Sequence, residues 1–163
     1  MLYHTALSIS SALTLHLTAD DNSLLRLDFA AQPFLQASAA ENHILQKAAQ
    51  ELREYFQGRR KTFTVPIRFN GTTFQQQVWQ ALRQIPYGTT CSYKELAASI
   101  GSPGASRAVG SACHCNPLPV IIPCHRVVGS SGKLTGYAGG LKLKKQLLQL
   151  EKTAALKTLT AKP

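Results

Sequence analysis

The residues with the clearest chemistry are Cys124 and His125, which are adjacent in the segment IIPCHRVVGSSG, Ile121 to Gly132. A thiol beside an imidazole is the pair that nucleophilic catalysis needs, because the imidazole can act as the base that produces the thiolate. In extended backbone, however, neighbouring side chains point to opposite faces. His125 therefore reaches the thiol only if the chain turns here, or through a bridging water. The alternative is a buried, inert thiol, since free cysteine is among the most buried residue types.

Glu151 is the candidate for a third group that would orient the base. It follows Leu147 and Leu148 by four and three residues, so a helix would place it on the same apolar face as these leucines. A carboxylate on an apolar face needs a partner, and His125 would provide one. The alternative is an exposed glutamate near the end of a helix.

The cysteine pattern does not favour a metal site. Four cysteines occur, Cys91, Cys113, Cys115 and Cys124, and in a cytosolic chain free thiols are expected rather than disulfides. Cys113 and Cys115 flank a histidine, but their spacing is C-x-C and not the C-x2-C of structural zinc sites, and the sequence has no second matched pair. We therefore predict neither a metal nor a cofactor.

The elements that must position these residues lie in a C-terminal domain that we predict at residues 70–163, after an N-terminal domain at residues 1–69. The sequence TTFQ at 72–75 is a capping box, and it begins a helix whose apolar stripe reaches Ile85. The sequence PYG at 86–88 stops that helix.

A helix-turn-helix pattern follows. The sequence SYKE at 92–95 is a second capping box and begins a short helix at about 93–100, which Gly101 ends. We expect Ser102 to cap the next helix, with Pro103 at its first position, and that helix to run to about residue 114. Two short helices joined by such a turn are typical of DNA-binding proteins.

The second of these helices has an unusual composition for a helix that reads bases. It contains small residues and one long side chain that protrudes, Arg107. A sequence-specific recognition helix carries several long side chains that form hydrogen bonds to bases. Small residues instead allow the helix backbone to approach DNA closely, with the arginine acting as a probe or wedge in the minor groove. The alternative is a tightly packed helix pair with Arg107 on a solvated face.

The segment that contains the candidate nucleophile is predicted to be extended on both sides of a turn. The apolar run 120–122 is extended, and Pro123 prevents a helix from continuing into Cys124. Residues 127–128 again resemble a strand, and 135–140 form a glycine-rich loop. We expect a last helix at about 141–151, followed by a basic, frayed tail from Lys152.

The N-terminal domain is predicted to be a scaffold of strands and one helix. Alternating apolar residues at 13–17 and 25–29 form a hairpin around a polar turn. An amphipathic helix at about 41–57 ends before Gly58, and a further strand at 63–65 ends at Pro66. This part of the sequence contains no cluster of catalytic residue types.

The charge distribution separates the two parts. The 163 residues carry a formal net charge of +10. Residues 1–66 hold six basic and six acidic side chains, whereas residues 67–163 hold twelve basic and two acidic ones. A strongly basic half favours a polyanion as the partner, most simply nucleic acid, and the alternative is a basic but merely soluble surface. The sequence has neither a signal peptide nor an apolar run long enough for a bilayer, so we expect a cytoplasmic protein without membrane contact.

The motifs of the C-terminal part resemble those of the O6-alkylguanine-DNA alkyltransferases, also called methylated-DNA–protein-cysteine methyltransferases. The segment Pro123 to Val128 (PCHRVV) is similar to the active-site signature of that family. The resemblance extends over residues 70–152 and includes the segments GTTFQQQVW (71–79), RAVG (107–110), NP (116–117) and GYAGG (136–140). Residues 1–66 are similar only in pattern.

The resemblance implies a fold and a set of catalytic roles. It implies a mixed α+β protein in which a ribonuclease-H-like α/β domain precedes a mostly helical domain that carries the helix-turn-helix and the reactive cysteine. Cys124 would accept the alkyl group, and His125 would deprotonate it through a water. Glu151 would hold His125, and Asn116 would support the active-site turn.

The resemblance also implies how the chain would bind DNA. Arg107 would occupy the gap left by a flipped base, and Tyr93 would help to rotate the nucleotide and donate to the guanine ring. Tyr137 and the backbone near Val127 and Ala138 would line the pocket. The positions that match contacts with the DNA backbone are Gln75, Lys94, Ser102 and Ser130.

The predicted function is the repair of double-stranded DNA by irreversible transfer of an alkyl group from O6 of guanine, and O4 of thymine, to Cys124. A thioether product would limit each molecule to one turnover, and flipping the base would expose O6 to attack. Relatives that only bind lesions have tryptophan at the acceptor position, so Cys124 places this chain outside that group. We expect a monomer, with cooperative binding along DNA left open. The alternatives are a helix-turn-helix protein that binds DNA without chemistry and a cysteine hydrolase.

Overall fold

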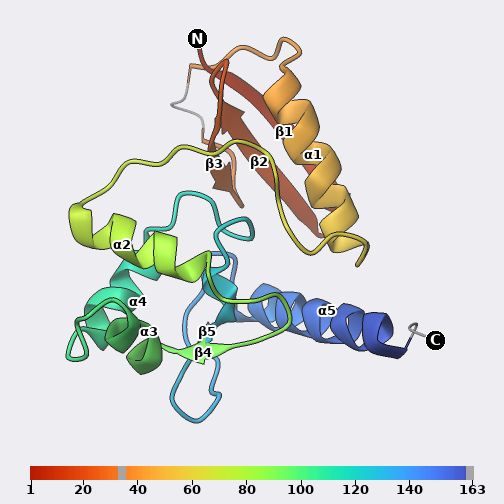
Figure 1. Cartoon of the computed structure of the whole chain (residues 1–163). Helices are drawn as coiled ribbons and strands as arrows, with labels where there is room; N and C mark the ends of the chain where they lie inside the picture. Colours follow the sequence, from red (N-terminus) through yellow and green to blue (C-terminus); the bar gives the residue numbers. More distant parts are fainter. Residues whose placement is uncertain (33–35, 161–163) are drawn as a thin grey trace. The chain divides into compact units, whose positions relative to one another are not determined.

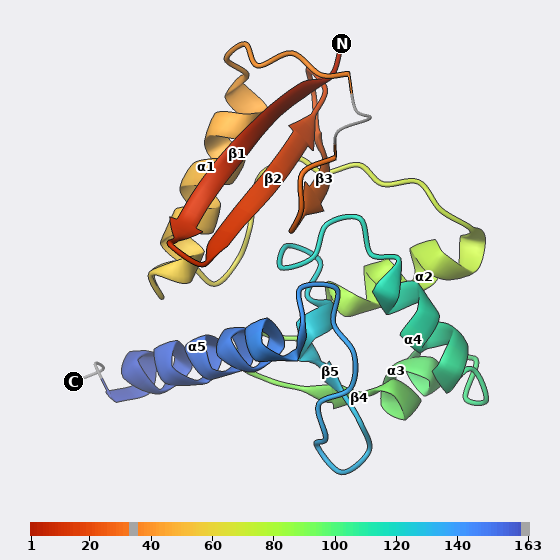
Figure 2. The same ribbon diagram turned by 180° about the vertical axis from the view of Figure 1, so that it is seen from behind.

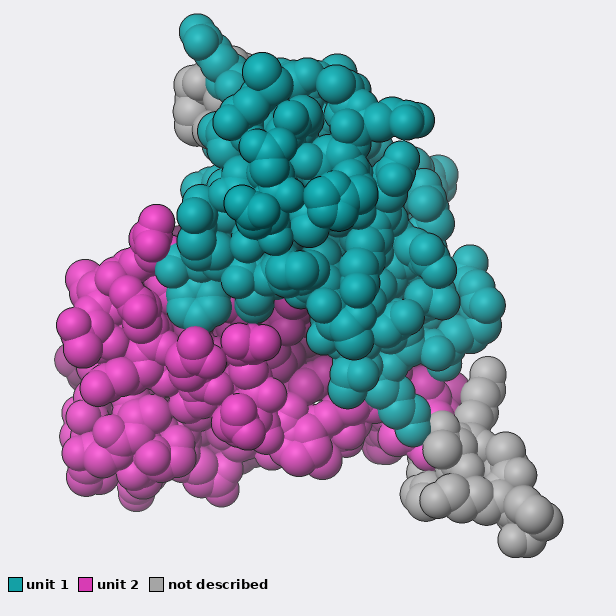
Figure 3. Space-filling model, turned by 45° about the horizontal axis from the view of Figure 1, so that its top comes forward, with its two compact units in different colours: residues 1–69 teal, residues 70–163 magenta. Residues whose placement is uncertain are grey.

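A computed structural model describes residues 1–32 and 36–160 of the chain. The chain forms two compact units, Met1–Phe69 and Asn70–Pro163, which Figure 3 colours separately. The first unit is built on a β-sheet and the second mostly on helices, so the predicted mixed α+β class is confirmed.

The first unit is a three-stranded antiparallel sheet with one helix. The strands β1 (Tyr3–Ser10), β2 (Leu13–Ala19) and β3 (Leu24–Asp28) lie in that order, and α1 (His43–Phe56) crosses one face of the sheet (Figures 1 and 2). Leu7 is opposite Leu15 and Leu17 is opposite Leu27 in the pairing register, and all four are buried. The predicted hairpin is present as β2 and β3, whereas β1 is a strand that we did not predict.

The strand predicted at residues 63–65 is absent, and a buried carboxylate explains the difference. Glu51 of α1 accepts hydrogen bonds at 2.9 Å from both the Thr64 and the Val65 backbone N–H, and at 2.5 Å from the Thr64 hydroxyl. These backbone donors are therefore not available to a strand ladder. The segment pairs with the sheet only later, through one bridge between Leu24 and Ile67.

The second unit contains the helices that the capping boxes predicted. In α2 (Thr73–Leu82) and α3 (Tyr93–Ser99), the Thr72–Gln75 and Ser92–Glu95 boxes each form both reciprocal hydrogen bonds. A turn connects α3 to α4 (Ser106–His114), and the Trp79 indole N–H donates to the Ala112 carbonyl at 2.8 Å. The helix-turn-helix is thus fixed against α2 through a buried hydrogen bond.

A small parallel sheet links the helix-turn-helix to the candidate nucleophile. β4 (Cys91–Ser92) immediately precedes α3, and it pairs with β5 (Val127–Val128), which follows the short 3₁₀ helix η1 (Cys124–Arg126). α5 (Leu141–Thr160) is the last element, and it lies on the opposite side of these two strands from α3 and α4 in both views (Figures 1 and 2). Among the described residues, no helix has the length and apolar content that crossing a membrane requires.

Two predicted helix boundaries in this unit are wrong. α4 begins at Ser106 rather than after Ser102, because residues 102–105 close a turn in which the Ala105 N–H donates to the Ser102 carbonyl at 2.9 Å. α5 continues to Thr160, so the tail expected from Lys152 is helical there. Ala154 is buried, which gives the extra turns an apolar contact face, and residues 161–163 of the expected tail lie outside the described residues.

Replacing Glu51 with alanine should destabilise the protein by roughly 2–4 kcal/mol, because two backbone N–H groups, of which that of Val65 is buried, and a hydroxyl lose their acceptor. Urea unfolding at neutral pH measures the change. Glu41→Ala, at an exposed carboxylate next to the same helix, is the matched control and should change the unfolding free energy by less than about 0.5 kcal/mol. Equal effects of the two variants would contradict the structural role of Glu51.

Candidate active site

The chain turns at Cys124, as the adjacent nucleophile and base require. Pro123 is the residue before the 3₁₀ helix, and it has no N–H to place in a preceding helix. The Cys124 N–H donates to the Ile122 carbonyl at 2.8 Å, and the Arg126 N–H donates to the Pro123 carbonyl at 3.1 Å. Cys124, His125 and Arg126 are all buried. The backbone is therefore not extended at Cys124 and His125, so their side chains are not forced to opposite faces.

Asn116 holds the loop that leads to this turn. Its side-chain amide donates to the Ile122 carbonyl at 2.8 Å, and its carbonyl oxygen accepts from the Leu118 N–H at 2.9 Å. Within this loop, Val120 is buried and has a φ of 76°, a left-handed conformation that a β-branched residue adopts only under constraint. Asn116 thus fixes Ile122, whose carbonyl in turn receives the Cys124 N–H.

A single buried carboxylate organises the base. His125 Nε2 lies 2.7 Å from Glu151 Oε2, as the sequence predicted for this pair. The Arg126 guanidinium reaches the same carboxylate with two hydrogen bonds, Nε to Oε1 at 2.8 Å and Nη2 to Oε2 at 3.0 Å. The Gly88 N–H also donates to Oε1 at 3.3 Å. Glu151 therefore joins α5 to the 3₁₀ helix and to the loop after α2.

The protonation states follow from these contacts. Burial raises the pKa of Glu151, but the hydrogen bonds and charges of His125 and Arg126 outweigh it and lower that pKa to about 2. Burial also lowers the pKa of His125, against the opposing effect of Glu151. At neutral pH, an ionised Glu151 accepts from a neutral His125, so the imidazole proton lies on Nε2. The lone pair of a neutral ring is then on Nδ1, which can serve as a base.

The environment of the thiol both opposes and supports ionisation. Burial raises the pKa of Cys124, while a hydrogen bond from Asn116 and the charge of Lys144 act to lower it. The Lys144 side chain is itself buried, and its ammonium donates to the carbonyls of Thr135 and Gly136 at 3.1 and 3.2 Å. Because the net pKa is raised, the thiol needs a base to become a nucleophile.

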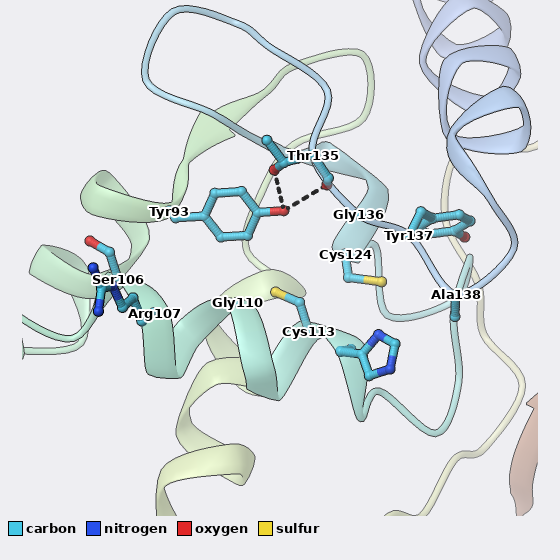
Figure 4. A pocket seen from close by; sticks show the side chains of 11 residues that line it. Tyr93, Ser106, Arg107, Gly110, Cys113, Cys124, Thr135, Gly136, Tyr137 and Ala138 are labelled. Carbon is cyan, nitrogen blue, oxygen red and sulfur yellow. Dashed lines mark hydrogen bonds between the residues drawn. The ribbon is translucent and has the colours of Figure 1, made fainter.

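A cavity of about 400 Å³ opens onto Cys124. Figure 4 shows the Cys124 and Cys113 sulfurs, the Tyr93 and Tyr137 rings and Arg107 around it. Its walls come from α3, α4 and the loop 135–138 before α5. A volume of this size suits a small aromatic ligand rather than a peptide or a protein.

The predicted site residues divide into three groups by position. The cavity is lined by Cys124, Tyr93, Arg107, Tyr137 and Ala138. The support described above consists of the buried His125 and Glu151 and the half-buried Asn116. The other predicted residues are not among those that line the cavity. Val127 is fully buried in β5, and Gln75 gives its side-chain oxygen to the capping box of α2. The remaining three lie at the surface of this unit and are Lys94, Ser102 and Ser130.

Two functional side chains, Arg126 and Lys144, were not predicted. Arg126 is a basic residue between a histidine and two valines, and nothing local to it indicates that it shares Glu151. Lys144 does have a signal, because it precedes Leu147 and Leu148 by three and four residues and therefore lies on the buried stripe of α5 with Glu151. A lysine on an apolar stripe is usually functional or paired.

Two family models match the chain. The model described as the DNA-binding domain of 6-O-methylguanine DNA methyltransferase matches residues 73–153, and the model described as its ribonuclease-like domain matches residues 3–69. Together they span both units.

Individual relatives agree with these matches. A methylated-DNA–protein-cysteine methyltransferase of Mycobacterium tuberculosis is 55% identical over 113 residues, which are 69% of this chain and 68% of the relative. One of Methanosarcina barkeri is 48% identical over 139 residues, 83% of this chain and 88% of the relative. The crystal structure of Mycobacterium tuberculosis OGT in complex with DNA superposes with a TM-score of 0.84 at 42% identity, covering 94% of this chain and 93% of that one.

Acid should weaken the fold through Glu151 and His125. A folded-state pKa of about 2 against an ordinary value of 4.5 means that Glu151 contributes stability above pH 4.5 and loses it as the pH falls toward 2. His125, with its pKa below 6.5, contributes above pH 6.5 and loses its contribution below it. The free energy of unfolding, measured by urea at a series of pH values, should therefore fall steadily from about pH 6.5 downward.

Glu151→Gln isolates the carboxylate in this experiment. The variant should be much less stable than the wild type at neutral pH, because Arg126 loses its buried partner. The difference should shrink as the pH falls from 4.5 toward 2, because the carboxylate of the unfolded wild-type chain then binds a proton that the folded chain does not. A difference that stays constant down to pH 3 would contradict the assigned ion pair.

Lys144→Met should raise the pKa of Cys124, because methionine fills a similar volume without the charge that favours the thiolate. The pH dependence of carbamidomethylation at Cys124 by iodoacetamide, followed by peptide mass mapping, measures this pKa. Lys145→Met removes the same charge from an exposed position one residue later and should leave the profile unchanged. Identical profiles for the two variants would show that the charge of Lys144 does not lower the pKa of Cys124.

Proposed function

This chain belongs to the family of methylated-DNA–protein-cysteine methyltransferases and is a DNA-repair enzyme of that type, and from this premise we propose that it moves an alkyl group from O6 of guanine in duplex DNA to Cys124. The observation that carries the proposal is the position of Cys124. Its thiol lies at a cavity large enough for a nucleobase, next to a histidine that a buried carboxylate orients and that burial keeps neutral.

The transfer uses the protein's own groups. His125 takes the thiol proton through a water, and Glu151 stabilises the imidazolium that forms. The thiolate attacks the alkyl carbon, so a C–S bond forms while the C–O bond breaks, and the guanine leaves with the electron pair of that bond and is reprotonated. Water does not cleave the thioether under mild conditions, so each molecule acts once.

The cavity residues fit a base that has left the duplex. O6 of a stacked guanine is difficult to approach in line, and extrusion into a pocket removes this obstacle. Arg107 would enter the gap in the duplex, and Tyr93 would donate to the extruded ring. The small side chains of α4 allow its backbone to lie close to the minor groove.

The wider DNA interface is proposed from the basic charge of this part of the chain and from the positions that resemble backbone contacts in the family. Gln75, Lys94, Ser102 and Ser130 would contact the phosphate backbone, and none of them would carry sequence information. Such contacts suit a repair protein that must find lesions in any sequence. We propose that the protein acts as a monomer on double-stranded DNA in the cytoplasm, and that O4-alkylthymine is a second substrate.

Incubation with duplex DNA containing one O6-methylguanine should add the mass of one methylene group to the protein, and peptide mapping should place it on Cys124. The Cys124→Ala variant should remain unmodified, because no other cysteine lies next to His125. Intact-mass spectrometry at a twofold excess of DNA measures both the site and the stoichiometry.

Three results would contradict the proposal. An adduct that persists at the same level in Cys124→Ala would place the acceptor elsewhere. Loss of the lesion from more DNA than there is protein would indicate turnover and would favour a hydrolase. Binding to the damaged duplex without any mass change would instead support a protein that recognises lesions without chemistry.

A further inference from the structure

Thr135 forms a paired contact with Tyr93 at the mouth of the cavity. The Tyr93 hydroxyl donates to the Thr135 carbonyl at 3.2 Å, and the Thr135 hydroxyl donates back to Tyr93 Oη at 3.2 Å (Figure 4). Tyr93 is at the N-terminus of α3, and Thr135 is in the loop before α5. The pair therefore joins two walls of the cavity through one phenolic oxygen.

The position of Thr135 is itself fixed from inside the protein. Lys144 is fully buried, and its ammonium donates to the Thr135 carbonyl at 3.1 Å and to Tyr93 Oη at 3.4 Å. The same ammonium lies 5.8 Å from the centre of the Tyr93 ring. Although Thr135 is exposed to solvent, its backbone is anchored to a buried charge, so its hydroxyl has a defined place relative to Tyr93.

These contacts assign different tasks to the proton and the lone pairs of Tyr93. Two donors, the Thr135 hydroxyl and the Lys144 ammonium, point at the phenolic oxygen. A phenol that accepts two hydrogen bonds keeps its O–H for one acceptor, which here is the Thr135 carbonyl. If a nucleobase in the cavity replaces that carbonyl as acceptor, the two donors still hold the Tyr93 oxygen and polarise its O–H toward the nucleobase.

We propose that Thr135 is a positioning residue for alkyl transfer, whose hydroxyl holds the Tyr93 oxygen so that its O–H points at the alkylated base in the cavity. The proposal rests on the function proposed above, because it needs a base in this cavity. Burial raises the pKa of Tyr93 and the hydrogen bond of Thr135 lowers it, so the same contact also makes Tyr93 a better donor.

Thr135→Val tests the hydroxyl alone, because valine keeps the β-branched shape and the backbone carbonyl. The single-turnover rate of transfer from duplex O6-methylguanine should fall about 3- to 10-fold, the effect of one neutral hydrogen bond, while the dissociation constant for the duplex stays within about 2-fold. Thr135→Ser keeps a hydroxyl and should stay within about 2-fold of the wild-type rate. Thermal unfolding should be unchanged, since the side chain is exposed.

The Tyr93→Phe background separates positioning from a simple contact between Thr135 and the substrate. If Thr135 acts through Tyr93, adding Thr135→Val to Tyr93→Phe should slow transfer by less than about 2-fold, because the phenolic oxygen is already absent. The same 3- to 10-fold loss in both backgrounds would overturn the proposal, as would a wild-type rate for Thr135→Val.

A measurement without DNA keeps this test separate from the proposed function. In ¹³C-tyrosine NMR, with Tyr93→Phe used for assignment, the pKa of Tyr93 should be higher in Thr135→Val than in the wild type. An unchanged titration would show that the hydroxyl does not act on Tyr93 and would overturn the proposal. If Thr135→Val shifts the titration of Tyr93 but the wild-type protein transfers no alkyl group, the proposed function is overturned. The contact then has no catalytic task.

Discussion

The active site depends on one buried carboxylate. Glu151 accepts from His125, Arg126 and the Gly88 backbone, and it is almost completely buried. A carboxylate in that position is tolerated only because charged donors surround it, and each donor is held in place by it. The base, the turn that carries the nucleophile and the last helix are therefore positioned by the same interaction.

The thiol is governed by two opposing requirements. A cavity that takes up a base with its alkyl group has the thiol buried at its wall, and burial disfavours the thiolate that has to attack. The site offsets this cost locally, through the Asn116 hydrogen bond and the Lys144 charge, rather than by exposing the sulfur. A thiol that stays protonated until His125 removes its proton is also protected from unwanted electrophiles and oxidants.

Features set by neighbours in the sequence could be predicted, and those set by distant contacts could not. Capping boxes and apolar stripes are local, so α2, α3 and the place of Glu151 on the buried face of the last helix followed from spacing. The pairing of Glu151 with His125 was predicted from the need of a carboxylate on an apolar face for a partner. The loop at residues 63–65 was missed because a glutamate more than ten residues earlier takes its backbone donors. Arg126 was missed for a similar reason, since only the fold brings it to a carboxylate on α5.

The most direct test of this account is the protonation of the His125 ring, measured by ¹⁵N NMR across pH 5 to 8. We predict a neutral ring at pH 7 with its proton on Nε2, because Nε2 donates to an ionised Glu151 and burial keeps the pKa of His125 low. Nδ1 would then be the base that activates Cys124. A doubly protonated ring at pH 7, or a neutral ring with its proton on Nδ1, would contradict it.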